Sequence, residues 1–303
     1  MAETQPAAKI RREYGVPEAV RLRVEEGVTL AFVDGCEDVV ADVAAHPDSI
    51  HGAATGAGRS LVGRGPLFVV ESPLGPLVVR ELRKGGMFRG VRGRLFHGAF
   101  RPLDELVLLR RCLGARVPVA EGVGAVVLGD ERGWRGFLLT RQVEGAVDLE
   151  SYLYGDGGPA PGAREVLHAA GLSVRRLHDA GVRHADLHPK NLLLERATGR
   201  VLVIDLDRAK AFGGTLPRDA RIENLARLGR AVEKHRLRGM RVSRRHALRF
   251  LEGYAGDADA ASKWLDEVRA RWKVGLPLRV LWWKWTGQAK PRERVAPPAG
   301  TAA

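Results

Sequence analysis

One stretch of the chain decides how the rest is interpreted. It reads His184-Ala185-Asp186-Leu187-His188-Pro189-Lys190-Asn191 and leads directly into the apolar run Leu192-Leu193-Leu194. A second apolar run, Val201-Leu202-Val203-Ile204, ends in Asp205, nineteen residues after Asp186. Short apolar runs bounded by polar residues are typical of buried strands. The sequence therefore predicts a polar loop before one strand and a second carboxylate after the next.

The order of these polar residues matches the signature of protein-kinase-like phosphotransferases. That signature has the form H-R-D-L-x-x-x-N, followed by the Asp of a D-F-G motif, and His184, Asp186, Leu187 and Asn191 fall in the same register. Such enzymes use a carboxylate to accept the proton of the attacking hydroxyl, so we assign this role to Asp186. Mg²⁺ prefers oxygen ligands, so Asn191 and Asp205 are predicted to hold it. Taken singly, an Asp in a loop is usually a turn or cap residue, and His184 is predicted to be architectural.

This motif and the length of the chain together indicate an α+β protein with a bilobal, protein-kinase-like fold. With 303 residues, of which 45% are hydrophobic, the chain can bury a core in two lobes around one cleft. We expect an N-terminal extension over 1–50, of which 1–20 are disordered or loosely attached. An N-lobe over 51–145 should hold an antiparallel sheet and one long helix. A mainly helical C-lobe is expected over 146–290, and a disordered tail over 291–303.

Several features predict a cytoplasmic protein. The two cysteines, Cys36 and Cys112, are too few for a disulfide scaffold and indicate a reducing compartment. No apolar run approaches the length of about 18 residues that a transmembrane helix needs. Residues 1–12 are polar and lack the apolar segment of a signal peptide.

The chain before the polar loop supplies candidate nucleotide-binding residues. Gly63-Arg64-Gly65 stands ahead of two strand-like runs, and such a turn lets backbone amides approach phosphates. The second run ends in Arg80, which we assign to the nucleotide phosphates in place of the usual Lys, with Lys84 as the alternative. Glu105, on a helix predicted over 103–113, is expected to pair with Arg80. Each of these residues also has a plain structural alternative, because Gly-rich turns and surface Glu residues are common.

The chain after Asp205 departs from the protein kinases. Asp207 replaces the Gly of the D-F-G motif, and no A-P-E segment follows. About a dozen residues separate Arg208 from the next predicted helix near Arg221, which is too few for a peptide platform. The pattern therefore favours a small-molecule or glycolipid acceptor.

The net charge of +13 is consistent with an anionic partner, such as a membrane surface or a phosphorylated substrate, although an Arg-rich surface that is simply solvated would give the same charge. Four of the six Trp residues lie among Lys and Arg in the tail over 272–285, and further basic residues gather at Arg89, Arg92, Arg94 and Arg101. Trp and basic side chains together suit an anionic membrane surface, although a closing helix packed on the C-lobe would explain the tail equally well. No zinc-finger or RNA-binding aromatic motif is present, so nucleic acid is not expected.

Several segments together resemble the 3-deoxy-D-manno-octulosonic acid (Kdo) kinase family, within the larger lipopolysaccharide kinase group. They are residues 63–65, 79–86, 139–146, 184–191, 204–209, 224–228 and 233–234. The resemblance implies phosphorylation of the 4-hydroxyl of Kdo with ATP and Mg²⁺, on an anionic acceptor of the Kdo–lipid A type. It also implies peripheral attachment to the cytoplasmic face of the inner membrane in a Gram-negative bacterium. An Arg at position 80 is usual in that family.

Within this scheme Lys190 is expected to neutralise the phosphoryl group during transfer. The acceptor stays open, because a heptose kinase of the same group or an antibiotic phosphotransferase would share every catalytic residue. A regulatory protein kinase fits less well, since the A-P-E segment is missing. A kinase-like binding module without turnover is a further alternative, but the base and both metal ligands are present.

Overall fold

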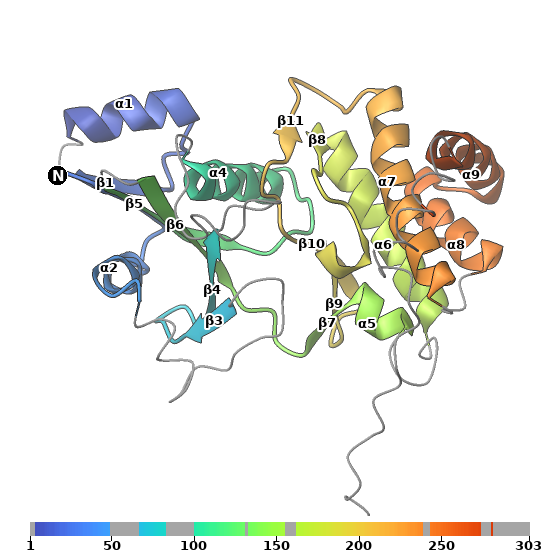
Figure 1. Ribbon diagram of the computed structural model, residues 1–303, viewed down its shortest axis with the longest axis horizontal. Coiled ribbons are helices and arrows are strands. Elements are labelled where there is room, and N and C mark those ends of the chain that lie inside the picture. The colour runs from blue at the N-terminus through green and yellow to red at the C-terminus, as the bar shows by residue number, and fades with distance from the viewer. Residues whose placement is uncertain are drawn as a thin grey trace, which may run out of the picture. The chain divides into compact units, whose positions relative to one another are not determined.

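The computed structural model describes residues 4–48, 67–82, 100–130, 133–154, 162–238, 243–273 and 280 (Figure 1). The chain forms two compact units. Unit 1 comprises Met1–Glu144 and Ile204–Ala211, and unit 2 comprises Gly145–Val203 and Phe212–Ala303. The chain thus leaves unit 1 after Glu144 and returns to it for one short segment, which contains Asp205.

Unit 1 is built on a six-stranded sheet in the order β1-β2-β5-β6-β4-β3, in which neighbouring strands are antiparallel. Its strands are β1 (Arg21–Glu25), β2 (Val28–Phe32), β3 (Leu67–Val70), β4 (Leu77–Leu82), β5 (Gly122–Asp130) and β6 (Gly133–Arg141). The described helices of this unit are α1 (Gln5–Tyr14), α2 (Glu37–Ala45) and α4 (Arg101–Gly114). The returning segment carries the short strand β11 (Lys210–Ala211).

Helix α4 turns its apolar face toward the sheet and carries Glu105 into the interior. Leu103, Leu106 and Leu109 recur every third residue and are buried, as expected of the core-facing side of a helix. Gly122 of β5 permits a close approach, since a Cβ there would lie 2.9 Å from Leu106 Cδ1. Glu105 is buried on the same helix.

The expectation that residues 1–20 are loosely attached is wrong for the described part of that segment. It forms helix α1, which ends at Gly15 in the left-handed conformation (φ 61°). The guanidinium of Arg11 then donates at 2.8–3.2 Å to the backbone carbonyls of Val16, Pro17 and Val20. Strands β1 and β2 follow and join the main sheet, so the predicted extension is a structural part of unit 1.

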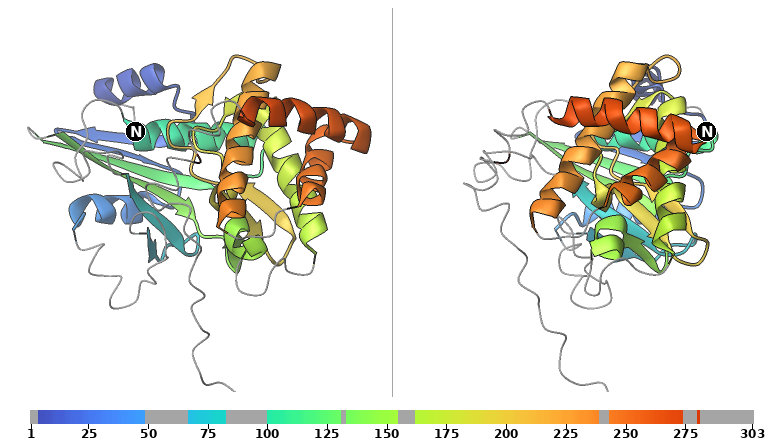
Figure 2. Two further views of the ribbon diagram at one scale, coloured as in Figure 1. Left: turned by 45° about the vertical axis from the view of Figure 1, so that its right-hand side comes forward. Right: turned by 90° about the vertical axis from the view of Figure 1, so that its right-hand side faces the viewer.

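Unit 2 is mainly helical, and Figures 1 and 2 show its helices α6 to α9 gathered in one group. Its helices are α5 (Leu149–Tyr154), α6 (Ala163–Asp179), the 3-10 helix η1 (Pro189–Asn191), α7 (Arg218–Leu237), α8 (Arg244–Ala255) and α9 (Ala258–Lys273). Its strands are β7 (Ala146–Asp148), β8 (Val182–Arg183), β9 (Leu192–Glu195) and β10 (Arg200–Val203), and three of them form a sheet in the order β10-β9-β7. The predicted α+β class, with an antiparallel sheet first and helices after it, is confirmed.

Helices α6 and α8 cross at two glycines. A Cβ added to Gly171 of α6 would lie 1.8 Å from the carbonyl oxygen of Phe250, and one added to Gly253 of α8 would lie 1.9 Å from that of His168. No side chain fits such gaps, so the two backbones can touch only because both positions lack a Cβ. Near this crossing Tyr254, at the end of α8, contacts His178, at the end of α6.

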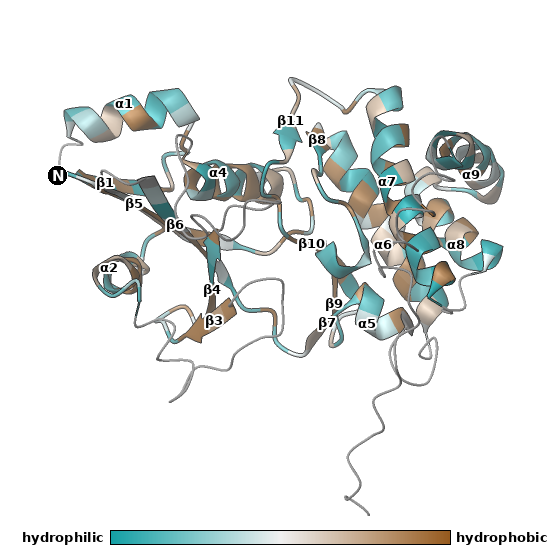
Figure 3. Cartoon of the chain, viewed as in Figure 1, coloured by the Kyte–Doolittle hydropathy of each residue, from teal (hydrophilic) through white to brown (hydrophobic). Residues whose placement is uncertain are grey.

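The hydropathy colouring in Figure 3 shows both brown and teal residues along α6, as expected of a helix with one apolar face. Five residues that form the apolar face of α6 are buried: Val166, Leu167, Ala170, Val174 and Leu177. Within the described ranges, no helix is long and apolar enough to span a membrane.

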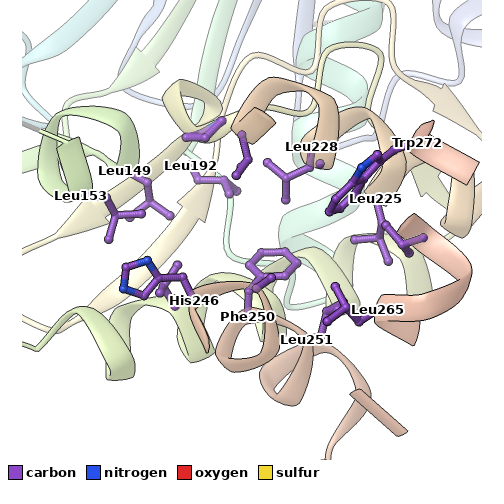
Figure 4. Close-up of a pocket in the computed structure, with 16 residues that line it drawn as sticks. Leu149, Leu153, Leu192, Leu225, Leu228, His246, Phe250, Leu251, Leu265 and Trp272 are labelled. Atoms are coloured by element: carbon purple, nitrogen blue, oxygen red, sulfur yellow. The ribbon is translucent and has the colours of Figure 1, made fainter. Parts of the chain in front are cut away.

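An apolar cavity of about 90 Å³ lies inside unit 2 and is lined by residues such as Leu149, Phe250 and Trp272 (Figure 4). The Trp272 ring packs against Gly229, where an added Cβ would lie 1.9 Å from the ring carbon Cε3. Trp272, the first residue of the predicted membrane-contacting tail, is therefore packed within unit 2. Residues 274–279 and 281–285 of that tail lie outside the described part of the chain, and their membrane contact stays a prediction.

Candidate active site

In unit 1, Arg80 joins two carboxylates. Strand β4 positions Arg80 so that its Nη2 donates to Glu105 Oε2 at 2.5 Å and its Nη1 donates to Asp205 Oδ1 at 2.8 Å. The Glu105 side chain is 2% exposed, whereas that of Asp205 is 43% exposed. The structure thus brings together three residues that the sequence assigned to the nucleotide and its metal. We call these three residues, Arg80, Glu105 and Asp205, the charged clamp. Its Asp205 side is open to solvent.

Within the charged clamp, burial and the ion pair between Arg80 and Glu105 shift the pKa values of these two residues in opposite directions. Burial tends to lower the pKa of Arg80, but Glu105 and Asp205 outweigh it and raise that pKa above its ordinary value. Burial raises the pKa of Glu105 to about 7, although the Arg80 guanidinium acts to lower it. Arg80 therefore remains charged at every physiological pH, while Glu105 is close to its midpoint of ionisation near neutrality.

Asp205 follows strand β10 with its backbone in the left-handed region (φ 61°). Asp tolerates this region better than most residues, and backbone conformations of this kind cluster at functional sites. The N–H of Ala209 donates to the Leu206 carbonyl at 2.9 Å and closes a turn directly after Asp205. The left-handed backbone of Asp205 therefore sets the direction of its side chain, which differs from the direction that a continuation of strand β10 would give.

Asp207, which replaces the Gly of D-F-G, has a partner in Arg101 at the start of α4. Arg101 Nε donates to Asp207 Oδ1 at 3.1 Å, and Nη2 of the same guanidinium contacts Oδ2. This two-point contact attaches the segment after Asp205 to helix α4, which a Gly could not do. Arg101 of the predicted basic patch thus serves this contact, while Arg89, Arg92 and Arg94 lie outside the described residues.

In unit 2, the main chain of Asp186 is held on both sides. Its N–H donates to His184 Nδ1 at 3.0 Å, and its carbonyl accepts from Asn191 Nδ2 at 2.9 Å. His184 and Asn191 are buried, whereas the Asp186 side chain is 43% exposed. A fixed backbone with an accessible carboxylate is the arrangement that a general base needs. Asn191 uses its amide nitrogen in this contact, which does not engage the oxygen that Mg²⁺ would prefer.

His184 is held in turn by a network of neutral groups. Asn224 of α7 forms two hydrogen bonds with the main chain of His184. Its Oδ1 accepts the His184 N–H at 3.1 Å, and its Nδ2 donates to the His184 carbonyl at 2.8 Å. Asn224 Oδ1 also lies 3.0 Å from His178 Nε2, and His178 Nδ1 lies 2.9 Å from the Tyr254 hydroxyl. We call these four residues, His184, Asn224, His178 and Tyr254, the neutral clamp.

The hydrogen bonds of the neutral clamp fix the proton on His178. Asn224 Oδ1 can only accept, so His178 carries its proton on Nε2 and accepts the Tyr254 O–H at Nδ1. Burial lowers the pKa of His178 to about 4, and burial raises the pKa of Tyr254 to about 12. Both rings are therefore neutral over the physiological range. Through Asn224, His178 supports the loop that carries Asp186.

Lys190 lies near a buried carboxylate. Its Nζ is 3.5 Å from Glu150 Oε1, and Glu150 Oε2 is 3.0 Å from His235 Nε2. The Lys190 side chain is half-exposed, and a long contact from an exposed ammonium contributes little. Lys190 can therefore turn from Glu150 to another anion at small cost.

Two further residues contact the Asp186 carboxylate, and the sequence did not single them out as site residues. Arg227 of α7 donates to Asp186 Oδ1 from Nη2 at 2.7 Å and from Nε at 3.2 Å. His188 Nε2 lies 3.6 Å from Asp186 Oδ2. The available signals were the position of His188 within the polar loop and that of Arg227 in a segment, 224–228, that resembles the lipopolysaccharide kinases.

The predicted site residues thus form one group in each unit. Asp186, Lys190 and Asn191 lie in unit 2, and the charged clamp lies in unit 1. Gly63, Gly65 and the alternative Lys84 lie outside the described residues. In the part of the chain that the structure describes, no cluster of three or more His, Cys, Asp or Glu could hold a metal ion. The remaining candidates, Asn191 and Asp205, offer oxygen atoms of the kind that suits Mg²⁺.

The chain matches a known protein family over most of these elements. The model of the lipopolysaccharide kinase (Kdo/WaaP) family matches residues 56–254. The 3-deoxy-D-manno-octulosonic acid kinase of Xanthomonas campestris pv. campestris (strain B100) is 34% identical over 187 residues, which are 59% of this chain and 70% of the relative. The protein of that name from Xanthomonas axonopodis pv. citri (strain 306) is 36% identical over 186 residues, with the same coverage.

The same likeness appears in three dimensions. A solved structure described as WaaP in complex with acyl carrier protein superposes with a TM-score of 0.50, at 21% identity, over 84% of this chain and 98% of that chain. This similarity concerns the fold alone. The family match includes Arg80, Glu105, Asp186, Asn191 and Asp205 and spans well over half of the chain. The chain therefore belongs to the lipopolysaccharide kinase (Kdo/WaaP) family and is a sugar-phosphorylating kinase that uses ATP.

Proposed function

We propose that this kinase transfers the γ-phosphoryl group of ATP to the 4-hydroxyl of Kdo on a lipid A-type acceptor, in the inner core of lipopolysaccharide. Relatives named as Kdo kinases, at 34–36% identity, support this choice of acceptor. The observation that carries the proposal is the fixed main chain of Asp186 beneath an accessible carboxylate. The short connection from Arg208 to α7 supports a glycolipid over a peptide.

The reaction forms a bond between the sugar oxygen and the γ-phosphorus. The bond from that phosphorus to the oxygen bridging to the β-phosphate breaks, and ADP leaves with the electron pair. The hydroxyl proton passes to Asp186, whose backbone is held on both sides so that its carboxylate meets the hydroxyl in one orientation. We assign Lys190 to neutralise the negative charge on the phosphoryl group during transfer. Its contact with Glu150 is long, so Lys190 can leave Glu150 and bind the phosphoryl group.

The charged clamp is assigned to the nucleotide. Arg80 binds phosphate oxygens and keeps Glu105, its buried partner, as the group that orients it. Its contact with the more exposed Asp205 is the one that a phosphate can replace, since both are anions and this side is open to solvent. We assign the Gly63–Gly65 turn to the same phosphates by resemblance to the family.

The oxygen donors of Asp205 and Asn191 fit Mg²⁺ and would hold it. A carboxylate and a carboxamide oxygen are the hard ligands that Mg²⁺ prefers. When bound, Mg²⁺ neutralises charge on the nucleotide phosphates. The role of Asn191 in fixing Asp186 is compatible with this assignment, because the two tasks use different atoms of one side chain.

The test is transfer of labelled γ-phosphate from ATP to a Kdo-bearing lipid A precursor, with heptosylated core lipid and a protein substrate in parallel. We expect label on the Kdo lipid only, and a fall of about 10²- to 10⁴-fold in Asp186→Asn, because the base is lost. Asp266→Asn, an exposed change on α9, is the matched control and should keep full transfer.

Two outcomes would contradict parts of this proposal. Label on the heptosylated lipid alone would assign the enzyme to heptose while keeping the catalytic residues. Near-normal transfer by Asp186→Asn would remove Asp186 as the base.

A further inference from the structure

We propose that Arg227 binds the carboxylate of the acceptor sugar and thereby directs the neighbouring hydroxyl to Asp186. This inference rests on the proposed function, because Kdo, an octulosonic acid, carries a carboxylate. Its starting point is the contact of the Arg227 guanidinium with the carboxylate of the base, at 2.7 Å from Nη2 and 3.2 Å from Nε. A neutral sugar acceptor would offer no anion at this position.

A cation on a general base has a cost for catalysis. It stabilises the carboxylate as an anion and so opposes the proton transfer that the base must perform. The cost falls when a second anion enters and shares the cation. An acceptor carboxylate bound to Arg227 would do this at the moment when the hydroxyl arrives.

The geometry of the guanidinium allows both contacts. Its two bonds to Asp186 use Nε and one hydrogen of Nη2, and both end on the same oxygen. A guanidinium has five N–H donors, so the edge formed by Nη1 and Nη2 can take the two oxygens of another carboxylate. No described residue occupies that edge of Arg227 with a hydrogen bond. The side chains of Arg227 and Asp186 are 45% and 43% exposed, which leaves room for a substrate to reach them.

The surroundings of Arg227 carry an excess of positive charge. Glu223, one turn earlier on α7, is paired with Arg183 at 3.3 Å and with Arg271 at 2.8 Å. These cations, led by the hydrogen bond from Arg271, lower the pKa of Glu223. Arg230, one turn after Arg227, adds another cation on the same side of the helix. An anionic acceptor is therefore favoured over a neutral one at this face of α7.

A simpler role for Arg227 is to hold the Asp186 side chain in place. The two roles differ in how they depend on the substrate. A residue that only holds the base would affect every acceptor equally, whereas a residue that binds the acceptor carboxylate would lose its effect when that carboxylate is removed. The acceptor can be altered at this one group by converting the Kdo carboxylate to its methyl ester.

The experiment measures phosphate transfer to the Kdo-bearing lipid A precursor and to its methyl ester, for the wild type and for Arg227→Gln. We expect the ester to lower kcat/KM of the wild type about tenfold, because a charge-assisted pair is lost. Arg227→Gln should lose about as much with the acid, mainly through the KM of the acceptor, and little more with the ester. The KM of ATP should not change. Arg227→Lys should recover part of the loss, since it keeps the charge without the fork.

Arg236→Gln is the matched control on the same helix. Arg236 is exposed and pairs with Glu233, so this variant should behave as the wild type with both acceptors. An equal fall in kcat with acid and ester for Arg227→Gln would overturn the assignment of Arg227 while leaving the proposed function intact. Absence of transfer by the wild type to either lipid would overturn the proposed function, and this inference with it.

Discussion

The two aspartates of the proposed site are held in different ways. Asp205 is contacted through its side chain, by Arg80, which is itself bound to the buried Glu105. Asp186 is fixed through its main chain, by Asn191 and by the neutral clamp that begins at His184, in addition to the contact of its side chain with Arg227. In an ion pair with an Arg side chain, another anion such as a phosphate can replace the carboxylate. The backbone hydrogen bonds of Asp186 face no such competing ligand. The charged clamp is therefore the adjustable part of the site, and the neutral clamp is the fixed part.

The clamps also differ in the consequence of losing one member. A buried charge left without its partner typically costs about 3–5 kcal/mol. An unpaired neutral polar group in the interior costs about 1–3 kcal/mol. Substitutions in the charged clamp should therefore cost more stability, while those in the neutral clamp should act on catalysis through the position of Asp186.

Replacing Arg80 by Met should have the largest effect. Glu105 would lose its cation inside unit 1, so we expect the free energy of unfolding to fall by about 3 kcal/mol. Phosphate transfer should fall at least about 100-fold, because the phosphates lose a bidentate partner. Urea unfolding and transfer of labelled phosphate measure the two effects.

The double variant Arg80→Met with Glu105→Met separates the effect on stability from the effect on phosphate transfer. An apolar pair should recover most of the lost stability, because no buried charge remains. Transfer should stay low. Recovery of transfer in the double variant would show that Arg80 stabilises the fold and does not bind the nucleotide.

Replacing Asn224 by Ala should break the neutral clamp with a smaller loss of stability. Two backbone groups of His184 and the Nε2 proton of His178 would lose their partner, at about 2 kcal/mol in the free energy of unfolding. We expect kcat to fall about tenfold with an unchanged KM for ATP, because the base is displaced. Tyr254→Phe removes only the hydroxyl and should show both effects in milder form. An unchanged kcat in Asn224→Ala would mean that the network has no role beyond folding.

The smallest effects concern the pH dependence of stability, which should have opposite signs for the two clamps. The folded His178 has its pKa lowered from 6.5 to about 4, so between these values only the unfolded chain binds the proton, and stability falls as the pH falls. The folded Glu105 has its pKa raised from 4.5 to about 7, so the folded chain binds the proton in that range, and stability falls as the pH rises. Each slope is about 1.4 kcal/mol per pH unit at most.

Two matched amide variants isolate these slopes. His178→Gln and Glu105→Gln each remove one titrating group and retain hydrogen-bonding atoms. Urea unfolding from pH 4.5 to 8 should show that the stability of the wild type relative to His178→Gln declines toward acid. Relative to Glu105→Gln it should decline toward neutral pH. Two slopes of the same sign would contradict the assigned ionisation states.

The charged clamp could be predicted from the sequence because each member belongs to a local pattern. Arg80 ends an apolar run, Glu105 stands on an amphipathic helix, and Asp205 follows a second apolar run. Known kinase chemistry then predicts that these elements supply one site. The details after Asp205 could not be predicted in the same way. Asp207 marks a departure from a motif, and only the structure shows that Arg101 binds it.

The neutral clamp could not be predicted, because nothing local joins its members. Asn224 stands forty residues after His184, and Tyr254 another thirty residues on. Their meeting depends on the backbone contact of α6 and α8 at Gly171 and Gly253, which no periodicity reveals. The ordered start of the chain escaped prediction for a related reason. A polar segment indicates disorder unless one knows that a side chain such as Arg11 gathers three carbonyl groups from the following turn.

The return of Ile204–Ala211 to unit 1 has a consequence for the order in which the enzyme is made. During synthesis the first 144 residues leave the ribosome with Arg80 and Glu105 but without Asp205. The carboxylate arrives only after Gly145–Val203, which carries the base and its loop, has also been translated. A chain that ends before Asp205 therefore lacks a complete charged clamp, and any chain that reaches Asp205 also holds Asp186 and its loop. The path of the chain thus ensures that the charged clamp is never completed before the base is present.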